Sequence, residues 1–308
     1  MSIFLDFDGT ITTEDTISEL ADFALRFQRE RGGGGDGAGA GTGPDLKPQW
    51  DALVRAYADD RRAQAAAYRP AAPDRRTPAD EAAFLRASKP VEARSLARVR
   101  ACALFRGIGP DALRAAGAAG AVRLRPGLAD FVARRAREGW RLYVVSVNWS
   151  AAFIEGACGS GFGEGVEVKV KVLANEVREV DGAVVGPEIL NRGGGGEGGG
   201  EGTRTLTNSC DKLEVMRAVL REEEEEGGLK DRPSVYFGDS TTDLECLLEA
   251  SRGIVIADAE DSPLLQTLRR IGRDVPRVRE AGSSLAEGGL AWAADFEEVM
   301  AHVDFTLE

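Results

Sequence analysis

Short apolar runs that end abruptly at a polar residue recur along this chain. The first covers residues 3–5, and others follow at 141–145, 234–238 and 253–257. Runs of this length, separated by helical patterns such as the one at 128–138, are typical of buried strands in a parallel sheet. The sequence therefore predicts an α/β fold built around such a sheet.

The stretch between the first two runs has a different pattern. It is rich in Ala, Arg and Leu, and it contains helical spacing but no clear strand, with a loop near 70–78. A helix is predicted to start near Asp15, because side chains that cap helices precede an apolar helical face there. We expect a discontinuous core, residues 1–15 and 121–308, and an inserted helical cap domain at 16–120.

One turn-rich region and the C-terminal segment complete the expected order of elements. Asp181-Gly182 is a strong hairpin signal, so an antiparallel excursion from the sheet is expected across residues 166–185. From residue 276 onward, apolar residues that include Trp292 follow helical spacing. They predict a closing helix that packs on the core.

Two low-complexity segments interrupt the predicted elements, and the second of them is expected to carry no function. Residues 32–44 and 192–202 are rich in glycine. Such segments are too polar and too flexible to pack, so both are interpreted as surface loops, the first of them disordered.

The composition excludes several kinds of site. The chain has 308 residues, 43% of them apolar, and a net charge of -12, which argues against nucleic acid or anionic membrane as a partner. Four cysteines without metal-binding spacing are interpreted as reduced packing residues, and His302 is the only histidine. No apolar run approaches the roughly 20 residues of a membrane span. Because the chain opens directly on a strand, a cytoplasmic location is expected; the sequence makes no prediction of oligomeric state.

Two acids stand directly after the first apolar run. Asp6 and Asp8 are separated by one residue. At about 4 Å and an effective dielectric of about 20, two carboxylates repel by about 4 kcal/mol, and a cation would offset this. A carboxylate at a strand end can attack phosphorus, while a second one gives a proton to the leaving oxygen.

The ends of later runs carry further candidates. Ser146-Val147-Asn148 offers a hydroxyl and backbone N–H groups at a helix start, which suit phosphoryl oxygens. After Gly238, Asp239 can ligate a hard cation, and Asp243 lies one helical turn later to hold a ligand or its water.

One lysine stands at a position that suits a functional site better than it suits the stability of its helix. Lys212 lies near the start of a predicted helix, where a cation opposes the helix dipole. Lys230 is the competing candidate. Lys212 is favoured, because Lys230 follows an acidic run and precedes Asp231-Arg232-Pro233, which is typical of a surface turn.

These motifs resemble those of a known family. Asp6-Phe7-Asp8-Gly9-Thr10 resembles the first motif of the haloacid dehalogenase (HAD) superfamily, and the segments at Ser146, Lys212 and Asp239 stand in the order of its other three. The resemblance implies a Rossmann-like core with a helical cap, and a Mg²⁺-dependent phosphatase that forms an aspartyl phosphate.

The resemblance also assigns roles to residues. It implies Asp6 as nucleophile, Asp8 as acid and base, and Lys212 as the cation that offsets charge on the nucleophile and on the transferring phosphoryl group. The metal ligands that it implies are Asp6, the backbone carbonyl of Asp8 and Asp239. Asp243, one helical turn after Asp239, is a further predicted ligand, either directly or through a water. The phosphate-binding residues are then Gly9, Thr10, Ser146, Val147 and Asn148.

The insertion after the first motif is similar in placement to the cap of phosphoserine-phosphatase-like members. Residues 235–250 resemble the phosphatase domain that some plants and fungi use on thiamine monophosphate. The resemblance implies a small phosphorylated metabolite as substrate, with thiamine monophosphate, pyridoxal phosphate and phosphoserine as candidates in that order. A phosphomutase of the same superfamily and a non-catalytic binding module with this fold are the alternatives.

Overall fold

The computed structural model describes residues 1–31, 43–119, 122–161, 169–191, 204–227, 233–281 and 286–305. The predictions made for residues 32–42 and 192–202, and the competing candidate Lys230, fall outside these ranges. All four cysteines lie within them and are free thiols, as predicted.

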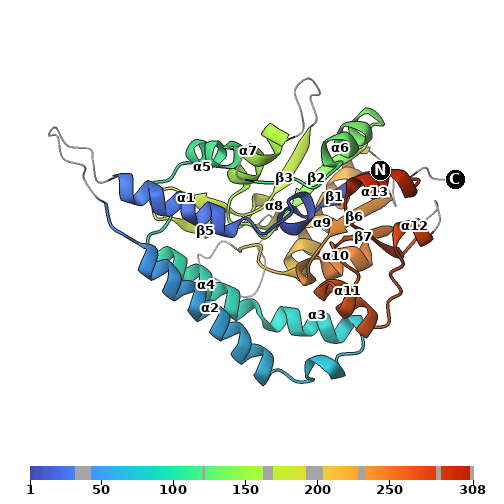
Figure 1. The fold of residues 1–308 in the computed structure, drawn as a ribbon, viewed down its shortest axis with the longest axis horizontal. Coiled ribbons are helices and arrows are strands. Elements are labelled where there is room, and N and C mark those ends of the chain that lie inside the picture. The colour runs from blue at the N-terminus through green and yellow to red at the C-terminus, as the bar shows by residue number, and fades with distance from the viewer. Residues whose placement is uncertain are drawn as a thin grey trace.

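Six parallel strands form one sheet in the order β3-β2-β1-β6-β7-β8 (Figure 1). Their bounds are β1 Ser2–Leu5, β2 Arg141–Val145, β3 Val170–Leu173, β6 Ser234–Gly238, β7 Arg252–Ile256 and β8 Gly289–Ala293. The first strand is central, and Leu5 is in register with Val144 on one side and Phe237 on the other. The carboxyl ends of β1, β2 and β6 therefore meet at one edge of the sheet, and the predicted α/β fold is confirmed.

Helices cover both faces of this sheet. Along β1, Ile3 and Leu5 point into one apolar cluster, whereas Phe4 points into a second one, because successive side chains of a strand face opposite ways. The longer helices are α1 Ile17–Glu30, α2 Lys47–Ala67, α3 Pro78–Ala87, α4 Lys89–Ala101, α5 Pro110–Ala118, α6 Leu128–Arg137, α7 Ala151–Gly161, α9 Ser209–Gly227 and α11 Pro263–Arg270. The shorter ones are α8 Glu188–Asn191, α10 Leu244–Glu249, α12 Val278–Ala281 and α13 Phe296–His302. Tight 3-10 turns form at η3 Ala72–Asp74 and η4 Thr241–Asp243. A wider turn, with non-helical backbone at Asp8 and Gly9, forms at η1 Phe7–Ile11.

In the described part of the inserted segment 16–120, all the longer elements are helices. Helices α2, α3 and α4 lie together on one side of the molecule (Figure 1). Arg75 Nε lies 2.7 Å from Glu81 Oε2 in a buried ion pair, and Arg270 Nη2 of α11 lies 2.8 Å from the same oxygen. This shared carboxylate ties the segment to the core, while its role as a separate cap domain stays a prediction.

The hairpin expected around Asp181 forms, but the preceding strand, β3, does not pair with it. Strands β4 Glu176–Arg178 and β5 Ala183–Val185 pair antiparallel, and Gly182 adopts a φ of +68° in the turn. The prediction for 166–173 is wrong where the chain is described, because β3 pairs parallel with β2 at the edge of the main sheet. Its valines are partly buried against one apolar cluster and Leu173 lies in the other, while Lys171 is exposed, so this edge strand is only partly covered.

The predicted closing helix is also wrong in part. Trp292 lies in β8, and the helix α13 begins only at Phe296, after the cap residue Asp295. Leu290 and Trp292 pack on one face of the sheet, while the alternate positions on the other face are alanines. Because alanine marks a buried position only weakly, the twofold period of this strand was hidden in the sequence.

Candidate active site

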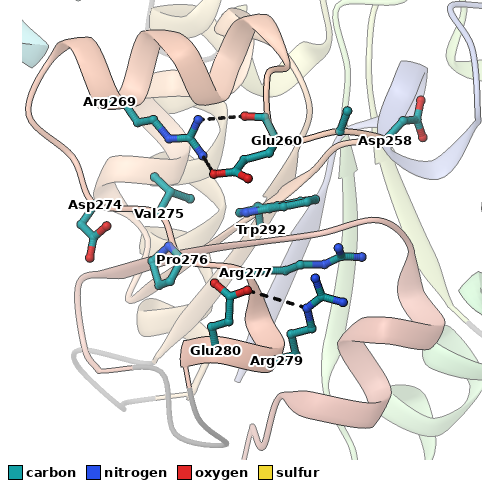
Figure 2. A pocket seen from close by; sticks show the side chains of 11 residues that line it. Asp258, Glu260, Arg269, Asp274, Val275, Pro276, Arg277, Arg279, Glu280 and Trp292 are labelled. Carbon is teal, nitrogen blue, oxygen red and sulfur yellow. Dashed lines mark hydrogen bonds and ion pairs between the residues drawn. The ribbon is translucent and has the colours of Figure 1, made fainter.

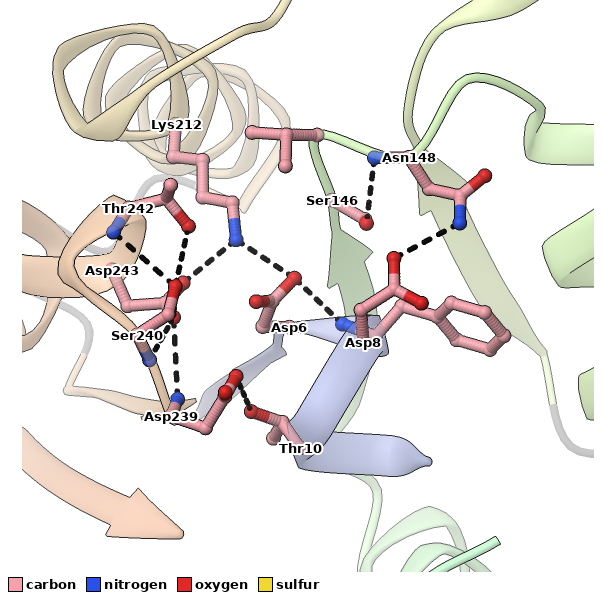
Figure 3. Close-up of polar contacts among 12 residues, drawn as sticks. Asp6, Asp8, Thr10, Ser146, Asn148, Lys212, Asp239, Ser240, Thr242 and Asp243 are labelled. Atoms are coloured by element: carbon pink, nitrogen blue, oxygen red, sulfur yellow. Dashed lines mark hydrogen bonds and ion pairs between the residues drawn. The ribbon is translucent and has the colours of Figure 1, made fainter. Parts of the chain in front are cut away.

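Three candidate residues lie together because they follow neighbouring strands. Asp6, Ser146 and Asp239 come directly after β1, β2 and β6, at the carboxyl edge of the sheet (Figure 3). Asp6 is 3% exposed and its Oδ1 accepts a hydrogen bond from Phe7 N–H at 2.7 Å. Ligand sites of open parallel sheets lie at this edge.

Lys212 joins the acids from the start of α9. It is fully buried, and its Nζ lies 2.7 Å from Asp6 Oδ1 and 2.7 Å from Asp243 Oδ1 (Figure 3). Asp243 also accepts hydrogen bonds from Tyr236 Oη at 2.8 Å and from the backbone N–H groups of Asp239 and Ser240. Both oxygens of Asp243 are therefore occupied by donors of the protein.

The electrostatics of this cluster show an excess of negative charge. Burial, followed by the charge of Asp243, raises the pKa of Asp6 well above its ordinary value, although Lys212 opposes this. Burial and Asp243 likewise raise the pKa of Asp239 to about 7. Burial lowers the pKa of Lys212, but the neighbouring Asp243 and Asp6 outweigh it and raise that pKa. The three carboxylates are only partly compensated by one ammonium group.

The same carboxylates suit a cation. Oxygen atoms of Asp6, Asp239 and Asp243 lie within 4.8 Å of one another. A set of carboxylate oxygens favours a hard divalent ion such as Mg²⁺, and such an ion would offset the repulsion that, after burial, raises the pKa values of Asp6 and Asp239. The residues therefore fit the cation that the family resemblance implies.

Asp8 lies beside this cluster and is held by other donors. Its Oδ1 accepts hydrogen bonds from the N–H and the hydroxyl of Thr16 at 2.8 and 2.6 Å, and its Oδ2 accepts one from Asn148 Nδ2 at 2.9 Å (Figure 3). Burial, followed by the charge of Asp15, raises the pKa of Asp8, while Thr16 and Asn148 oppose the rise. The Asn148 amide, predicted to bind phosphate, thus contacts Asp8.

The other predicted phosphate-binding residues have identifiable contacts. Thr10 Oγ1 donates to Asp239 Oδ1 at 3.1 Å, and the hydroxyl of Ser146 accepts from Asn148 N–H at 3.1 Å. Gly9 has a φ of +77°, and a Cβ atom there would lie 2.3 Å from Asp239 Oδ2. Val147 packs against an apolar cluster. Gly9 is therefore required both by its backbone conformation and by the close approach of Asp239.

Sequence reasoning missed Asn175. This residue is 1% exposed, and its Nδ2 donates to the carbonyl oxygens of Val147, Asn148 and Leu206 at 3.1, 3.1 and 2.9 Å. It ties the loop after β2 to the segment that leads into α9. Asn175 follows β3, so a polar residue after a strand was the available signal, but that strand had been assigned to the hairpin.

A cavity of about 460 Å³ beside the ends of β7 and β8 is separate from this site (Figure 2). None of the predicted site residues lines it. Two of its arginines are paired with acids, Arg269 with Glu260 at 2.9 Å and Arg277 with Glu298 at 2.6 Å. Its charges are largely balanced within the protein, in contrast to those around Lys212.

A Rossmann-like parallel sheet that gathers acids, a lysine and a hydroxyl at its carboxyl edge defines an α/β protein with a candidate active site at that edge. The sequence model of the haloacid dehalogenase-like hydrolases matches residues 3–248, and the chain belongs to this family. The resemblance drawn from the four motifs is thereby confirmed.

Several known proteins are similar to this chain. The Bifunctional TH2 protein, mitochondrial, of Arabidopsis thaliana is 30% identical over 131 residues, which are 42% of this chain but only 17% of that protein. A HAD family hydrolase from Salmonella enterica serovar Typhi has a TM-score of 0.50 and 13% identity, over 99% of this chain and 72% of that one. A phosphoserine phosphatase structure has a TM-score of 0.49 and 13% identity, over 98% of both chains. At 13% identity, the similarity to the Salmonella hydrolase concerns the fold alone. Within the described ranges, no helix has the length and apolar character needed to cross a membrane.

Proposed function

We propose that this protein is a Mg²⁺-dependent phosphomonoester hydrolase that acts on a small phosphorylated metabolite through an aspartyl phosphate on Asp6. The observation that carries the proposal is the position of Lys212, buried between Asp6 and Asp243 at 2.7 Å from each. Burying charged groups costs free energy that a structural role could avoid with apolar residues. Membership of a hydrolase family supports the same reading.

Asp6 is the nucleophile of this mechanism. The hydrogen bond from Phe7 N–H and the ion pair with Lys212 both go to Oδ1. Within the described part of the chain, no hydrogen bond goes to Oδ2, which is the oxygen that attacks phosphorus. A new P–O bond to Asp6 forms as the bond to the leaving alkoxide breaks.

Asp8 carries the proton. Its raised pKa suits a carboxyl group that gives a proton to the leaving oxygen. The resulting carboxylate then takes a proton from water, which hydrolyses the aspartyl phosphate. The hydrogen bonds from Thr16 and Asn148 fix the carboxylate in place for both steps.

The remaining residues bind and orient. Asp6, Asp239 and the Asp8 backbone carbonyl would hold Mg²⁺. Because both oxygens of Asp243 already accept hydrogen bonds from the protein, a ligand role for Asp243 stays a prediction, and Asp243 would support the other ligands through Lys212 and the Asp239 N–H. When bound, Mg²⁺ neutralises charge on the nucleophile and on the phosphoryl group. The Ser146 hydroxyl accepts from Asn148 N–H, so its own proton can be donated to a phosphoryl oxygen. Phosphate-binding roles for Gly9, Thr10, Val147 and Asn148 stay predictions.

The test is hydrolysis of p-nitrophenyl phosphate. Turnover should require Mg²⁺ and vanish in Asp6→Asn, while Asp22→Asn, which alters an exposed aspartate of α1, should keep full activity. Metal-independent turnover would refute the mechanism.

A screen of phosphorylated metabolites would then identify the substrate. Thiamine monophosphate, pyridoxal phosphate and phosphoserine remain the candidates in that order, on the resemblance of residues 235–250. No turnover of any phosphoester would favour the binding module, and transfer of the phosphoryl group within a sugar phosphate would favour the phosphomutase.

A further inference from the structure

A buried arginine outside the four motifs contacts the turn that follows Asp8. Arg125 lies just before α6 and is 8% exposed. Its Nη2 and Nε donate to the carbonyl oxygen of Gly9 at 2.9 and 3.2 Å. Its Nη1 donates to Ala294 O at 3.3 Å and forms an ion pair with Asp258.

These contacts connect the Gly9 turn with the segments that follow the outer strands β7 and β8. Ala294 and Asp258 follow β8 and β7, whereas Gly9 follows β1. The backbone strengthens the attachment, since Arg125 N–H donates to Ile11 O at 2.9 Å. One guanidinium group therefore spans the space between the turn and the outer strands.

The turn in question contacts the metal-binding candidate Asp239. The α-carbon of Gly9 packs against the Asp239 carboxylate so closely that a Cβ atom would not fit, and Thr10 Oγ1 donates to Asp239 Oδ1 at 3.1 Å. Displacement of the Gly9 carbonyl would move both contacts. It would also move the peptide next to Asp8.

An arginine is well suited to this task. Its planar guanidinium presents several donors in a fixed geometry, which lysine lacks. A buried guanidinium without an anionic partner is costly, and Asp258 supplies that partner. The Asp258 side chain is 78% exposed and also lines the cavity in Figure 2.

We propose that Arg125 is a positioning residue of the active site, which holds the Gly9-Thr10 turn against Asp239, and that Asp258 orients Arg125. The placement of the turn is independent of the proposed function. The expected effect on catalysis rests on the proposed function.

Hydrogen exchange of the metal-free protein tests the placement. In Arg125→Lys, amide exchange across residues 7–13 should become about tenfold faster or more, because charge-assisted hydrogen bonds to the turn are lost. Arg135→Lys is the matched control, since Arg135 is also buried but packs near Phe131, Trp140 and Phe305. Equal exchange of this segment in the two variants would overturn the proposal.

Kinetics test the consequence. Arg125→Lys should lower kcat for p-nitrophenyl phosphate by about a hundredfold with a much smaller change in KM, since a small misplacement of reacting groups has effects of this size. Arg135→Lys should keep the wild-type kcat. An unchanged kcat in Arg125→Lys would refute the positioning role.

A milder variant covers the case in which Arg125→Lys does not fold. Asp258→Asn should change exchange of residues 7–13 in the same direction, whereas Asp274→Asn, which alters another acid of the same cavity, should not. Identical behaviour of these two variants would overturn the role of Asp258. An inactive wild-type protein would instead refute the proposed function, and the exchange experiment would still decide the role of Arg125.

Discussion

Asn148 Nδ2 lies 2.9 Å from Asp8 Oδ2, and the same amide nitrogen lies 3.1 Å from Thr16 Oγ1. Asn148 is fully buried and follows β2, whereas Asp8 follows β1. The carboxyl group proposed to carry the proton is thus held by the end of a neighbouring strand. Its position depends on the register of the sheet as much as on its own turn.

Replacing Asn148 by Ala should lower kcat for p-nitrophenyl phosphate by about tenfold to a hundredfold. A hydrogen bond to a charged group contributes about 1.5–3 kcal/mol, and this one fixes Asp8. Steady-state kinetics would measure the loss. Asn191→Ala is the control, because Asn191 bonds to the Gly186 and Pro187 carbonyls, apart from the site. Equal kcat in the two variants would show that Asn148 does not position Asp8.

Replacing Lys212 by Met should abolish activity and lower the free energy of unfolding by about 3–5 kcal/mol, since removing one partner leaves buried carboxylates uncompensated. Urea denaturation at pH 8 would measure this. Lys230→Met tests the competing lysine and should affect neither quantity. A comparable loss of activity in that variant would show that Lys230 is the catalytic lysine.

Replacing Gly9 by Ala should remove activity beyond what backbone strain explains. Gly9 and Gly139 have φ values of +77° and +79°, but only at Gly9 would a Cβ atom meet a neighbour, the Asp239 carboxylate. Both variants should lose about 1–2 kcal/mol of stability through the left-handed conformation. Thermal unfolding and phosphatase assays of the two would separate the effects, and an active Gly9→Ala enzyme would contradict the contact.

Stability should fall as the pH rises toward 7 because of Glu176. Burial, followed by the charge of Glu155, raises the pKa of Glu176 from 4.5 to about 7, against the opposing effect of Arg114. The folded protein then holds this proton more tightly than the unfolded chain does. The resulting stabilisation is complete below about pH 4.5 and is lost as the pH rises through about 7.

The measurement is the difference in unfolding free energy between Glu176→Gln and the wild type. The glutamine has no carboxyl group to ionise, and the other groups titrate alike in both proteins. The variant should therefore gain stability relative to the wild type between pH 4 and pH 8. A difference that stays constant over this range would contradict the raised pKa.

The local sequence identified several of the candidate site residues. Asp6, Ser146 and Asp239 were found because each follows an apolar run, and the end of a buried strand is visible in a few consecutive residues. The Asp181-Gly182 turn was found because this dipeptide is itself a hairpin signal. Such features depend on backbone preferences and on burial within one element, so they can be read without knowledge of the fold.

Only the tertiary structure decided which side chains meet. Arg125 and Trp292 carry no local pattern that separates them from ordinary loop or helix residues. The signal at Asn175 depends on where β3 pairs, and Asn148 bonds to Asp8 across two strand ends. These contacts join segments that are far apart in sequence, and they exist only once strand order and register are fixed. The sequence by itself determined the kinds of groups in the site, while packing of the whole sheet determined their partners, because hydrogen bonds and charges act over a few ångströms in space.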